Sequence, residues 1–444
     1  MMTMKPICTI LLALSPSVHA ADLMSTYRDA LVQDPVFLAA KAQLAAALEK
    51  VPQGRSLLLP VVGLVANTTY NHFNTALTSP VPAALPLGGS GSYNSNGYTV
   101  SLSQPVFQMQ SWIQLDEAHL QVAAAEAQYH ASEQDLILRT GSAYFDVLLA
   151  QDNAELVQAQ KAAISEQLQQ AKLSFEVGTA TITDTHEAQA RFDLIAAQEI
   201  AVRSDLEIKK RALAVLTGKM PGGLASIDPK FEPGLPLPDD VDKWVAMALE
   251  NNLDLESRRI LEKIAEKEVD RRRAGHYPSI AIVASYGDNS SSGGMLVNVG
   301  TSTKSSAIGL QLNLPIYQGG SISSQAREAV ANLEKAKDEA ENAKRAAELN
   351  VRQAFLGVES GMAQVKALEQ ALLSSQSSLD STKLGREVGV RTAVDVLNAQ
   401  QQLYSAKRDL YKARYDYLVS ELKLKAASGS LQLADLEAVN RALH

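Results

Sequence analysis

The amino-acid sequence predicts an α+β membrane protein built from long helices and a small number of strands. Two long stretches, 106–220 and 316–444, contain no proline and are rich in the helix-favouring residues Ala, Gln, Glu, Lys and Leu. Two shorter segments instead alternate apolar and polar residues with the period of a strand. The two halves of the chain also repeat one another at a spacing of about 211 residues.

The first 20 residues have the layout of a secretory signal peptide. Lys5 precedes a short apolar run, and Val18 and Ala20 provide the small residues of a cleavage site. Cys8, the only cysteine, lies inside this segment, so we expect a mature chain without thiol, disulfide or lipid anchor. No later apolar stretch reaches the roughly 18 residues of a membrane helix, so strands are the expected membrane-spanning elements.

Charge and motif content argue against several functions. The chain has 41 Lys and Arg against 49 Asp and Glu, a net charge of −8, and acidic chains are poor nucleic-acid binders. The histidines have neither His-Glu-x-x-His spacing nor a cysteine partner, so we expect no metal site. No cofactor motif or catalytic set is recognisable, so we expect no cofactor and a protein that is not an enzyme.

The internal repeat is the most informative feature of the sequence. The pairs that recur at a shift of 211 include Val177 and Val388, Gly178 and Gly389, Thr181 and Thr392, and Asp184 and Asp395. Upstream, Pro105 corresponds to Pro315 at a shift of 210, and Pro60 to Pro278 at a shift of 218. Five prolines between residues 221 and 238 indicate an extended linker between the copies.

This repeat predicts the domain organisation. A signal peptide would occupy residues 1–20, a first structural repeat 21–218, a proline-rich linker 219–239, a second repeat 240–429 and a C-terminal tail 430–444. Each repeat should contain one helix, a β-hairpin, a long helix, a turn and a returning helix. The first helices are expected in 22–58 and 240–275, and the hairpins at about 60–105 and about 278–315.

The repeated Val-Gly segments should end the long helices. Gly178 and Gly389 suit the left-handed conformation that follows a helix C-terminus. Three residues after each glycine, a threonine begins the Thr-x-x-Asp spacing of a capping box, which starts a new helix. Each copy should therefore contain a helical hairpin, and its first arm of roughly 70 residues would be about 105 Å long.

The strands should have one apolar and one polar face. Segments 98–103 and 307–314 alternate in this way, as do outer-membrane barrel strands of about ten residues. The aromatic residues expected near strand ends are Tyr70, Tyr98, Phe107, Tyr286 and Tyr317. Four strands cannot enclose a pore, because the smallest bacterial barrels have eight and open edges in lipid leave backbone groups unsatisfied. We therefore expect a homotrimer whose twelve strands form a barrel in outer-membrane lipid, continuous with an α-helical tunnel.

Two segments carry a resemblance to a known family. These are Leu-Asn-Leu-Pro-Ile-Tyr-Gln-Gly-Gly at 312–320 and Val-Gly-Val-Arg-Thr-Ala-Val-Asp-Val-Leu at 388–397. With the duplicated hairpins, they make the chain resemble the TolC-like outer membrane efflux family over nearly its whole mature length. The resemblance implies an outer membrane channel-tunnel that exports proteins by type I secretion, or drugs and toxins. It also implies two partners, a periplasmic adaptor and an inner-membrane transporter of the ABC or proton-driven class.

The resemblance also implies roles for residues near the repeated turns. Thr183 and Asp184 would be linked to Arg386 and Arg391 across neighbouring helix pairs and would hold the periplasmic end shut. Asp395 would contribute a ring of carboxylates to the lumen. The adaptor-facing tips would be Val177, Gly178, Val388 and Gly389.

This chain departs from the family pattern at two positions. Arg386 stands in place of a linking tyrosine, and Asn398 stands in place of a second lumen aspartate. Asp184 and Asp395 are also explained as helix caps alone, which contribute about 1 kcal/mol each.

Two other functions remain open at this point. A trimeric structural or adhesive stalk would also use long helices and a shared barrel, although a stalk usually has its strands at one terminus. A secreted α+β enzyme is the third reading, and the missing catalytic set argues against it.

Overall fold

The computed structural model describes residues 21–76, 89–228, 231–294 and 299–443, so the expected signal peptide lies outside the described residues. The chain divides into two compact units. The first comprises Met1–Ala40, His130–Asn252 and Ala346–His444, and the second Lys41–Tyr129 and Leu253–Arg345. Each unit therefore draws on both halves of the sequence. Among the described residues, no helix is both long enough and apolar enough to cross a membrane.

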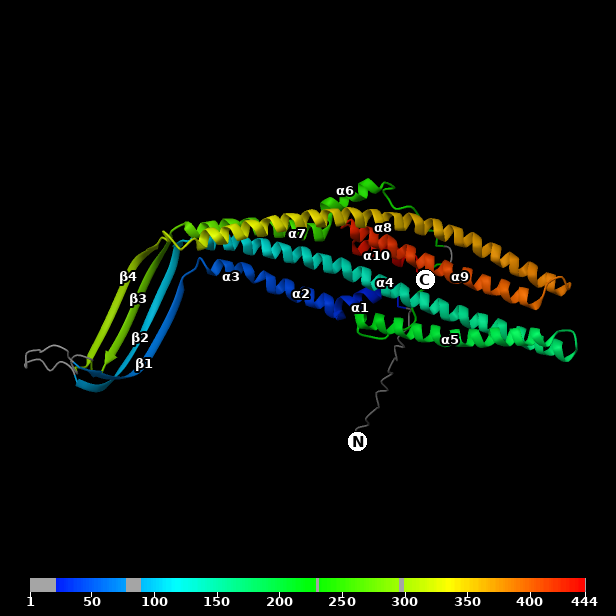
Figure 1. Cartoon of the computed structure of the whole chain (residues 1–444), viewed down its shortest axis with the longest axis horizontal. Coiled ribbons are helices and arrows are strands. Elements are labelled where there is room, and N and C mark those ends of the chain that lie inside the picture. Colours follow the sequence, from blue (N-terminus) through cyan, green and yellow to red (C-terminus); the bar gives the residue numbers. More distant parts are fainter. Residues whose placement is uncertain (1–20, 77–88, 229–230, 295–298, 444) are drawn as a thin grey trace, which may run out of the picture. The chain divides into compact units, whose positions relative to one another are not determined.

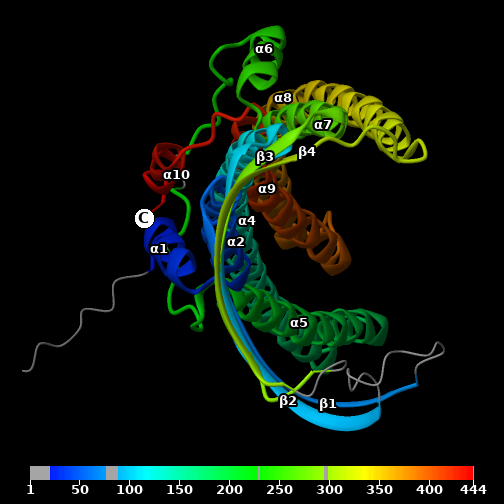
Figure 2. The same cartoon turned by 90° about the vertical axis from the view of Figure 1, so that its left-hand side faces the viewer.

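The second unit contains one curved antiparallel sheet (Figure 2). Its strands are β1 (Val61–Thr75), β2 (Gly89–Phe107), β3 (Ser279–Ser291) and β4 (Thr301–Asn313), paired in the order β1-β2-β3-β4. Two hairpins, β1–β2 and β3–β4, are joined by pairing of β2 with β3. The sheet therefore leaves β1 and β4 as edge strands.

The strands are longer than the roughly ten residues expected from their alternating segments. They have 15, 19, 13 and 13 residues, because backbone pairing continues through polar Ser, Asn and Gly residues at the hairpin ends. Gly89 and Gly91 belong to β2. Tyr98 and Tyr286 consequently lie inside their strands rather than near the ends, with ring centroids 6.4 Å apart.

Four long helices form two helical hairpins (Figure 1). The first hairpin consists of α4 (Met109–Glu176) and α5 (Ile182–Thr217), and the second of α8 (Ser321–Glu387) and α9 (Ala393–Ala427). In the first unit, α4 packs against α9 through aromatic side chains. The ring of Phe145 lies 5.8 Å from Tyr144 and 5.7 Å from Tyr415, and all three residues are buried.

The shorter helices differ from the single helix expected in each of two segments. Residues 22–58 form α1 (Leu23–Gln33), α2 (Pro35–Leu48) and α3 (Lys50–Ser56). Residues 240–275 form α6 (Val241–Asn251) and α7 (Leu253–Arg273), and the 3₁₀ turn η1 (Ala274–His276) follows. The first break occurs at Asp34, whose backbone is extended because the residue before a proline avoids helical geometry.

The break between α6 and α7 occurs at Asn252, which is not followed by a proline. Its backbone is also extended, and its side-chain amide donates to the carbonyl of Ala427 at 3.0 Å. The break at Asp34 is also held by a residue distant in sequence, because Arg139 binds the buried Asp34 carboxylate at 2.8 Å.

Residues beyond 430, expected to be a tail, include the helix α10 (Leu433–Asn440). It packs against α1 and α9, with Asn440 donating to Asp22 at 3.0 Å and Lys425 to Asp435 at 2.8 Å. Part of the proline-rich linker packs within the first unit, where the Tyr144 hydroxyl donates to the carbonyl of Ala225 at 2.8 Å.

Candidate functional site

The candidate site lies at the turns of the two helical hairpins, which are found at the same end of the first unit (Figure 1). After α4, Gly178 has φ of 80°, a conformation that L side chains rarely adopt. The amides of Gly178 and Thr179 donate to the carbonyls of Phe175 and Ser174 at 3.0 and 2.8 Å. These bonds satisfy carbonyls at the end of α4, so the glycine is required by the turn itself.

The turn after α8 repeats this geometry. Gly389 has φ of 78°, and the amides of Val390 and Arg391 both donate to the carbonyl of Gly385, at 2.8 and 3.0 Å. A Cβ atom at Gly385 would meet the Arg391 side chain at 2.8 Å. Gly385 therefore allows the stem of Arg391 to lie close against the end of α8.

Both returning helices begin with a complete capping box, as the sequence predicts. The amide of Asp184 donates to the Thr181 hydroxyl at 3.3 Å, and the Thr181 amide donates to the Asp184 carboxylate at 2.9 Å. Thr392 and Asp395 form the same pair of bonds at 3.2 and 2.9 Å. The backbone amide and hydroxyl of Thr392, with a smaller contribution from the charge of Arg391, lower the pKa of Asp395.

Apolar side chains are exposed at both turns. Val177 is 74% exposed, Val388 67% and Val390 79%. The two valines with matching positions in the repeat therefore project into solvent beside their glycines, where they are accessible to another molecule.

The four expected gate residues do not contact one another within the chain. Among the described residues, no hydrogen bond or ion pair joins Thr183 or Asp184 to Arg386 or Arg391, and neither arginine forms an ion pair. Arg391 is exposed and Arg386 is half-buried. Any link between these groups must therefore be made to another chain or after the hairpins move.

The structure reveals a contact between the hairpins that the sequence did not suggest. Arg191 of α5 donates to Gln401 Oε1 at 2.6 Å and to Asn398 Oδ1 at 2.8 Å, both on α9. Gln167 of α4 donates to Gln400 at 2.9 Å. We call these five residues the hairpin contact. Among the described residues, their hydrogen bonds are the ones between the two hairpins that lie closest to the turns.

An apolar cluster supports the hairpin contact. Leu397 of α9 is buried among Val157 and Ile164 of α4 and Ile195 of α5. A cavity of about 280 Å³ adjoins it, lined mainly by Leu, Ile and Gln side chains together with Arg191. The repeat pairs Gln400 with Gln189, but repetition alone did not indicate which of these residues would contact another hairpin.

A buried carboxyl lies farther along the same pair of helices. The hydroxyl of Tyr415 donates to Asp152 at 2.6 Å. Burial raises the pKa of Asp152 to about 6, and the charge of Glu155 adds to this effect, although the hydrogen bond from Tyr415 opposes it.

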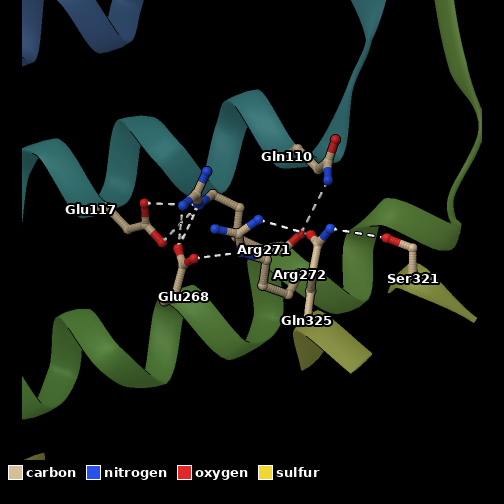
Figure 3. Close-up of polar contacts among 7 residues, drawn as sticks. All are labelled: Gln110, Glu117, Glu268, Arg271, Arg272, Ser321 and Gln325. Atoms are coloured by element: carbon tan, nitrogen blue, oxygen red, sulfur yellow. Dashed lines mark hydrogen bonds and ion pairs between the residues drawn. The ribbon is translucent and has the colours of Figure 1, made fainter. Parts of the chain in front are cut away.

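Arg271 and Arg272, near the end of α7, belong to a second polar cluster (Figure 3). In the second unit, Arg271 binds Glu117 of α4 at 3.2 Å and Glu268 of its own helix. Arg272 binds Glu268 at 2.6 Å and Gln325 of α8 at 2.9 Å. Burial raises the pKa of Glu117 to about 7 against the opposing charge of Arg271. The cluster joins α4, α7 and α8. Arg271 and Arg272 therefore have a structural role in holding these helices together.

No group of three or more His, Cys, Asp or Glu side chains suitable for a metal ion occurs among the described residues.

Comparison with known proteins identifies the family. The family model described as "Outer membrane efflux protein" matches residues 26–219 and 244–430, one match in each half. The chain is 36% identical to outer membrane protein TolC of Vibrio cholerae over 432 residues, covering 97% of this chain and 95% of the relative. It is 33% identical to the alkaline protease secretion protein AprF of Pseudomonas aeruginosa, covering 99% of this chain and 92% of the relative.

A solved structure shows the same fold. The CmeC outer membrane channel of Campylobacter jejuni superimposes with a TM-score of 0.79 at 19% identity, covering 95% of this chain and 89% of that one. Channels of this family are trimers in which each chain contributes four strands to a twelve-stranded barrel above a helical tunnel. The family performs transport rather than catalysis. The family match favours a channel over the stalk considered from the sequence. The chain belongs to the outer membrane efflux protein family, and it is an outer membrane channel for export that extends into the periplasm.

Proposed function

We propose that this chain, as a homotrimer, is the outer membrane duct of a multi-protein export system. It would dock onto a periplasmic adaptor protein and receive cargo from an inner-membrane transporter of the ABC or proton-driven class. The cargo would be a protein secreted by a type I system, or drugs and toxins. The name of the Pseudomonas aeruginosa relative, an alkaline protease secretion protein, supports the first kind of cargo.

The matched turns of the two hairpins are the observation that carries this proposal. The turns of the two hairpins lie at the same end of the first unit (Figure 1). One turn contains Val177 and Gly178 and the other Val388 and Gly389, and both valines are exposed. Exposed apolar residues beside glycine allow close approach of a partner backbone. An adaptor that grips both turns of each chain would meet six similar surfaces around the trimer.

The gate would be formed between chains. Arg386 and Arg391 have no ion-pair partner among the residues described in this chain, and Thr183 with Asp184 occupy the equivalent turn of the other hairpin. An arginine–carboxylate bond between neighbouring chains would be charge-assisted. Each exposed pair contributes only about 0–1 kcal/mol, but threefold symmetry repeats it three times.

The lumen would carry one acidic ring. Asp395 would supply one carboxylate from each of the three chains. Asn398, three residues later on the same helix, would supply none. Hydrogen bonds from Thr392 lower the pKa of Asp395 and so favour its ionised form. Such a ring favours cations in a narrow pore.

Single-channel recording in a planar bilayer tests the gate. Arg386→Ala combined with Arg391→Ser should raise the conductance, because the closed end loses its links. Arg345→Ala is the control, since Arg345 pairs with Glu341 on its own helix at 2.9 Å. A double variant that conducts like the control, in trimers of normal mass, would remove these arginines from the gate.

A further inference from the structure

The outer edges of β1 and β4 have no partner strand among the residues that the structure describes. Every residue of β4 is exposed, including the apolar Ile308 at 81%. On the other edge, Tyr70 of β1 is 72% exposed. A strand edge in a membrane must be paired, because lipid cannot satisfy its backbone groups. In a homotrimer, the occupant of the β4 edge is β1 of the next copy.

The register of this joint follows from the pairing already present in the chain. In the first hairpin, Leu64 lies opposite Val100. Adding the repeat shifts of 218 and 210 gives Ile282 and Leu310, which lie opposite each other in the second hairpin. The same two shifts convert every other opposed pair of β1 and β2 into an opposed pair of β3 and β4, wherever both shifted residues lie in those strands. The repeat therefore preserves strand register.

We infer that β4 pairs with β1 of the partner subunit in the register of β2 with β3, so that residue numbers in each opposed pair add to 378. In the chain, Ser101 of β2 lies opposite Ser285 of β3. Adding 210 to 101 gives Gln311, and subtracting 218 from 285 gives Asn67. Gln311 should therefore lie opposite Asn67 of the partner subunit. This inference rests on the proposed homotrimer and fixes how its chains join.

The chemistry of the resulting pairs supports this register. Leu102 and Ala284, opposed within the chain, correspond to Leu312 and Ala66 across the joint. Both pairs consist of leucine facing alanine on the apolar side of the sheet. Because cross-strand partners pack in pairs, the same combination of large and small residues would fill the same space.

The polar side of the sheet gives the same result. Thr99 and Gly287, which are in contact within the chain, correspond to Gly309 and Thr69 across the joint. Threonine and glycine exchange strands between the two pairs, but each pair still places a threonine opposite a glycine. A slip of one residue would oppose apolar to polar faces along the whole joint, so it is excluded.

Disulfide crosslinking between opposed positions tests the register. Opposed residues of antiparallel strands have Cα atoms about 4.5–5.5 Å apart, which suits a disulfide, whereas diagonal neighbours are about 7–8 Å apart. Three double variants in a Cys8→Ser background would be purified as intact trimers and oxidised. Gln311→Cys with Asn67→Cys is the predicted pair. Gln311→Cys with Val65→Cys and Gln311→Cys with Thr69→Cys are shifted by two residues in either direction.

A positive control is available within the chain. Ser101→Cys with Ser285→Cys places two thiols at the equivalent positions of the β2–β3 joint and should close a disulfide inside one chain. For the predicted pair, we expect a covalently linked trimer on a non-reducing denaturing gel, with roughly tenfold more crosslinking than in either shifted pair.

The remaining outcomes separate the register from the homotrimer. Preferential crosslinking of a shifted pair would overturn the register and leave the homotrimer intact. Trimers that crosslink in none of the three pairs, while the control forms its disulfide, would overturn the pairing of β4 with β1. Particles with the mass of one chain before oxidation would overturn the homotrimer itself.

Discussion

Replacing Arg191 with alanine tests whether the hairpin contact holds the channel closed. Arg191 joins α5 to α9 through bonds of 2.6 Å to Gln401 and 2.8 Å to Asn398. The turns beyond this contact are free of one another among the described residues. If the two hairpins separate when the channel opens, these bonds must break in every chain.

The magnitude follows from the number of bonds and their exposure. A hydrogen bond contributes about 0.5–1.5 kcal/mol net, and more when the donor is charged. Arg191 is only half-buried and both acceptors are exposed, so we assign about 1 kcal/mol to the pair of bonds in each chain. Three chains that open together would lose about 3 kcal/mol, which changes the closed-to-open ratio by roughly a hundredfold.

The assay is the open probability of single channels in a planar bilayer. Arg191→Ala should raise it strongly. Arg203→Ala is the matched control, because Arg203 lies on the same helix and pairs with Glu199 of that helix at 2.7 Å. Asn398→Ala should produce part of the same effect and add little to Arg191→Ala, since both remove one interaction. The reasoning fails if Arg191→Ala and Arg203→Ala channels open equally often.

Two further predictions concern acidic residues. Asp395→Ala should weaken cation selectivity and block by a trivalent cation from the periplasmic side, whereas a purely capping role predicts lower stability with unchanged selectivity. Asp152→Asn should reduce the pH dependence of unfolding. Burial raises the folded pKa of Asp152 to about 6, above the value of 3.8 for a free carboxyl, so the folded chain binds the proton more tightly than the unfolded chain. Stability should therefore fall as pH rises from about 4 through 6, by up to roughly 3 kcal/mol per chain. Denaturant unfolding of both proteins at pH 4.5 and 8 measures this, and an equal pH response in the variant would show that another group is responsible.

The turns were predictable because their determinants are local. Gly178 and Gly389 each predict a left-handed conformation after a helix. Thr181 and Thr392 each precede an aspartate by three residues, which is the spacing of a capping box. These signals lie within seven residues of one another in the sequence. Each also occurs twice, so each copy supports the interpretation of the other.

Strand length and helix breaks were less predictable, since they depend on partners elsewhere in the chain. Alternation identifies a strand only where one face is apolar, yet Gly89 and Gly91 pair with β1 through backbone bonds alone. Asn252 ends α6 with a side-chain bond to Ala427, 175 residues away. Such distant pairs leave no periodic signal in the sequence.

The polar contacts between helices were missed for the same reason. Arg191 and Gln401 are 210 residues apart, and Glu117 and Arg271 are 154 apart. An arginine on a long helix is most often a solvated residue, so neither position is distinctive by itself. The resemblance to a family pointed instead to Arg386 and Arg391, which form no ion pair within the described chain.

If both proposals hold, Arg191 on the one hand and Arg386 with Arg391 on the other would contribute separately to the closed state. Arg191 bonds to Asn398 inside one chain, next to the buried Leu397, and would limit how far the two hairpins of that chain separate. Arg386 and Arg391 lie beyond that contact, at a turn where none of the residues described in this chain forms an ion pair with them. The in-chain bonds therefore stabilise the shape of each hairpin pair, while bonds between chains would stabilise the arrangement of three such pairs. Because no residue is shared between the two sets, the proposed adaptor, if it grips the turns, would break the bonds between chains first and would strain the hairpin contact only as the turns move apart.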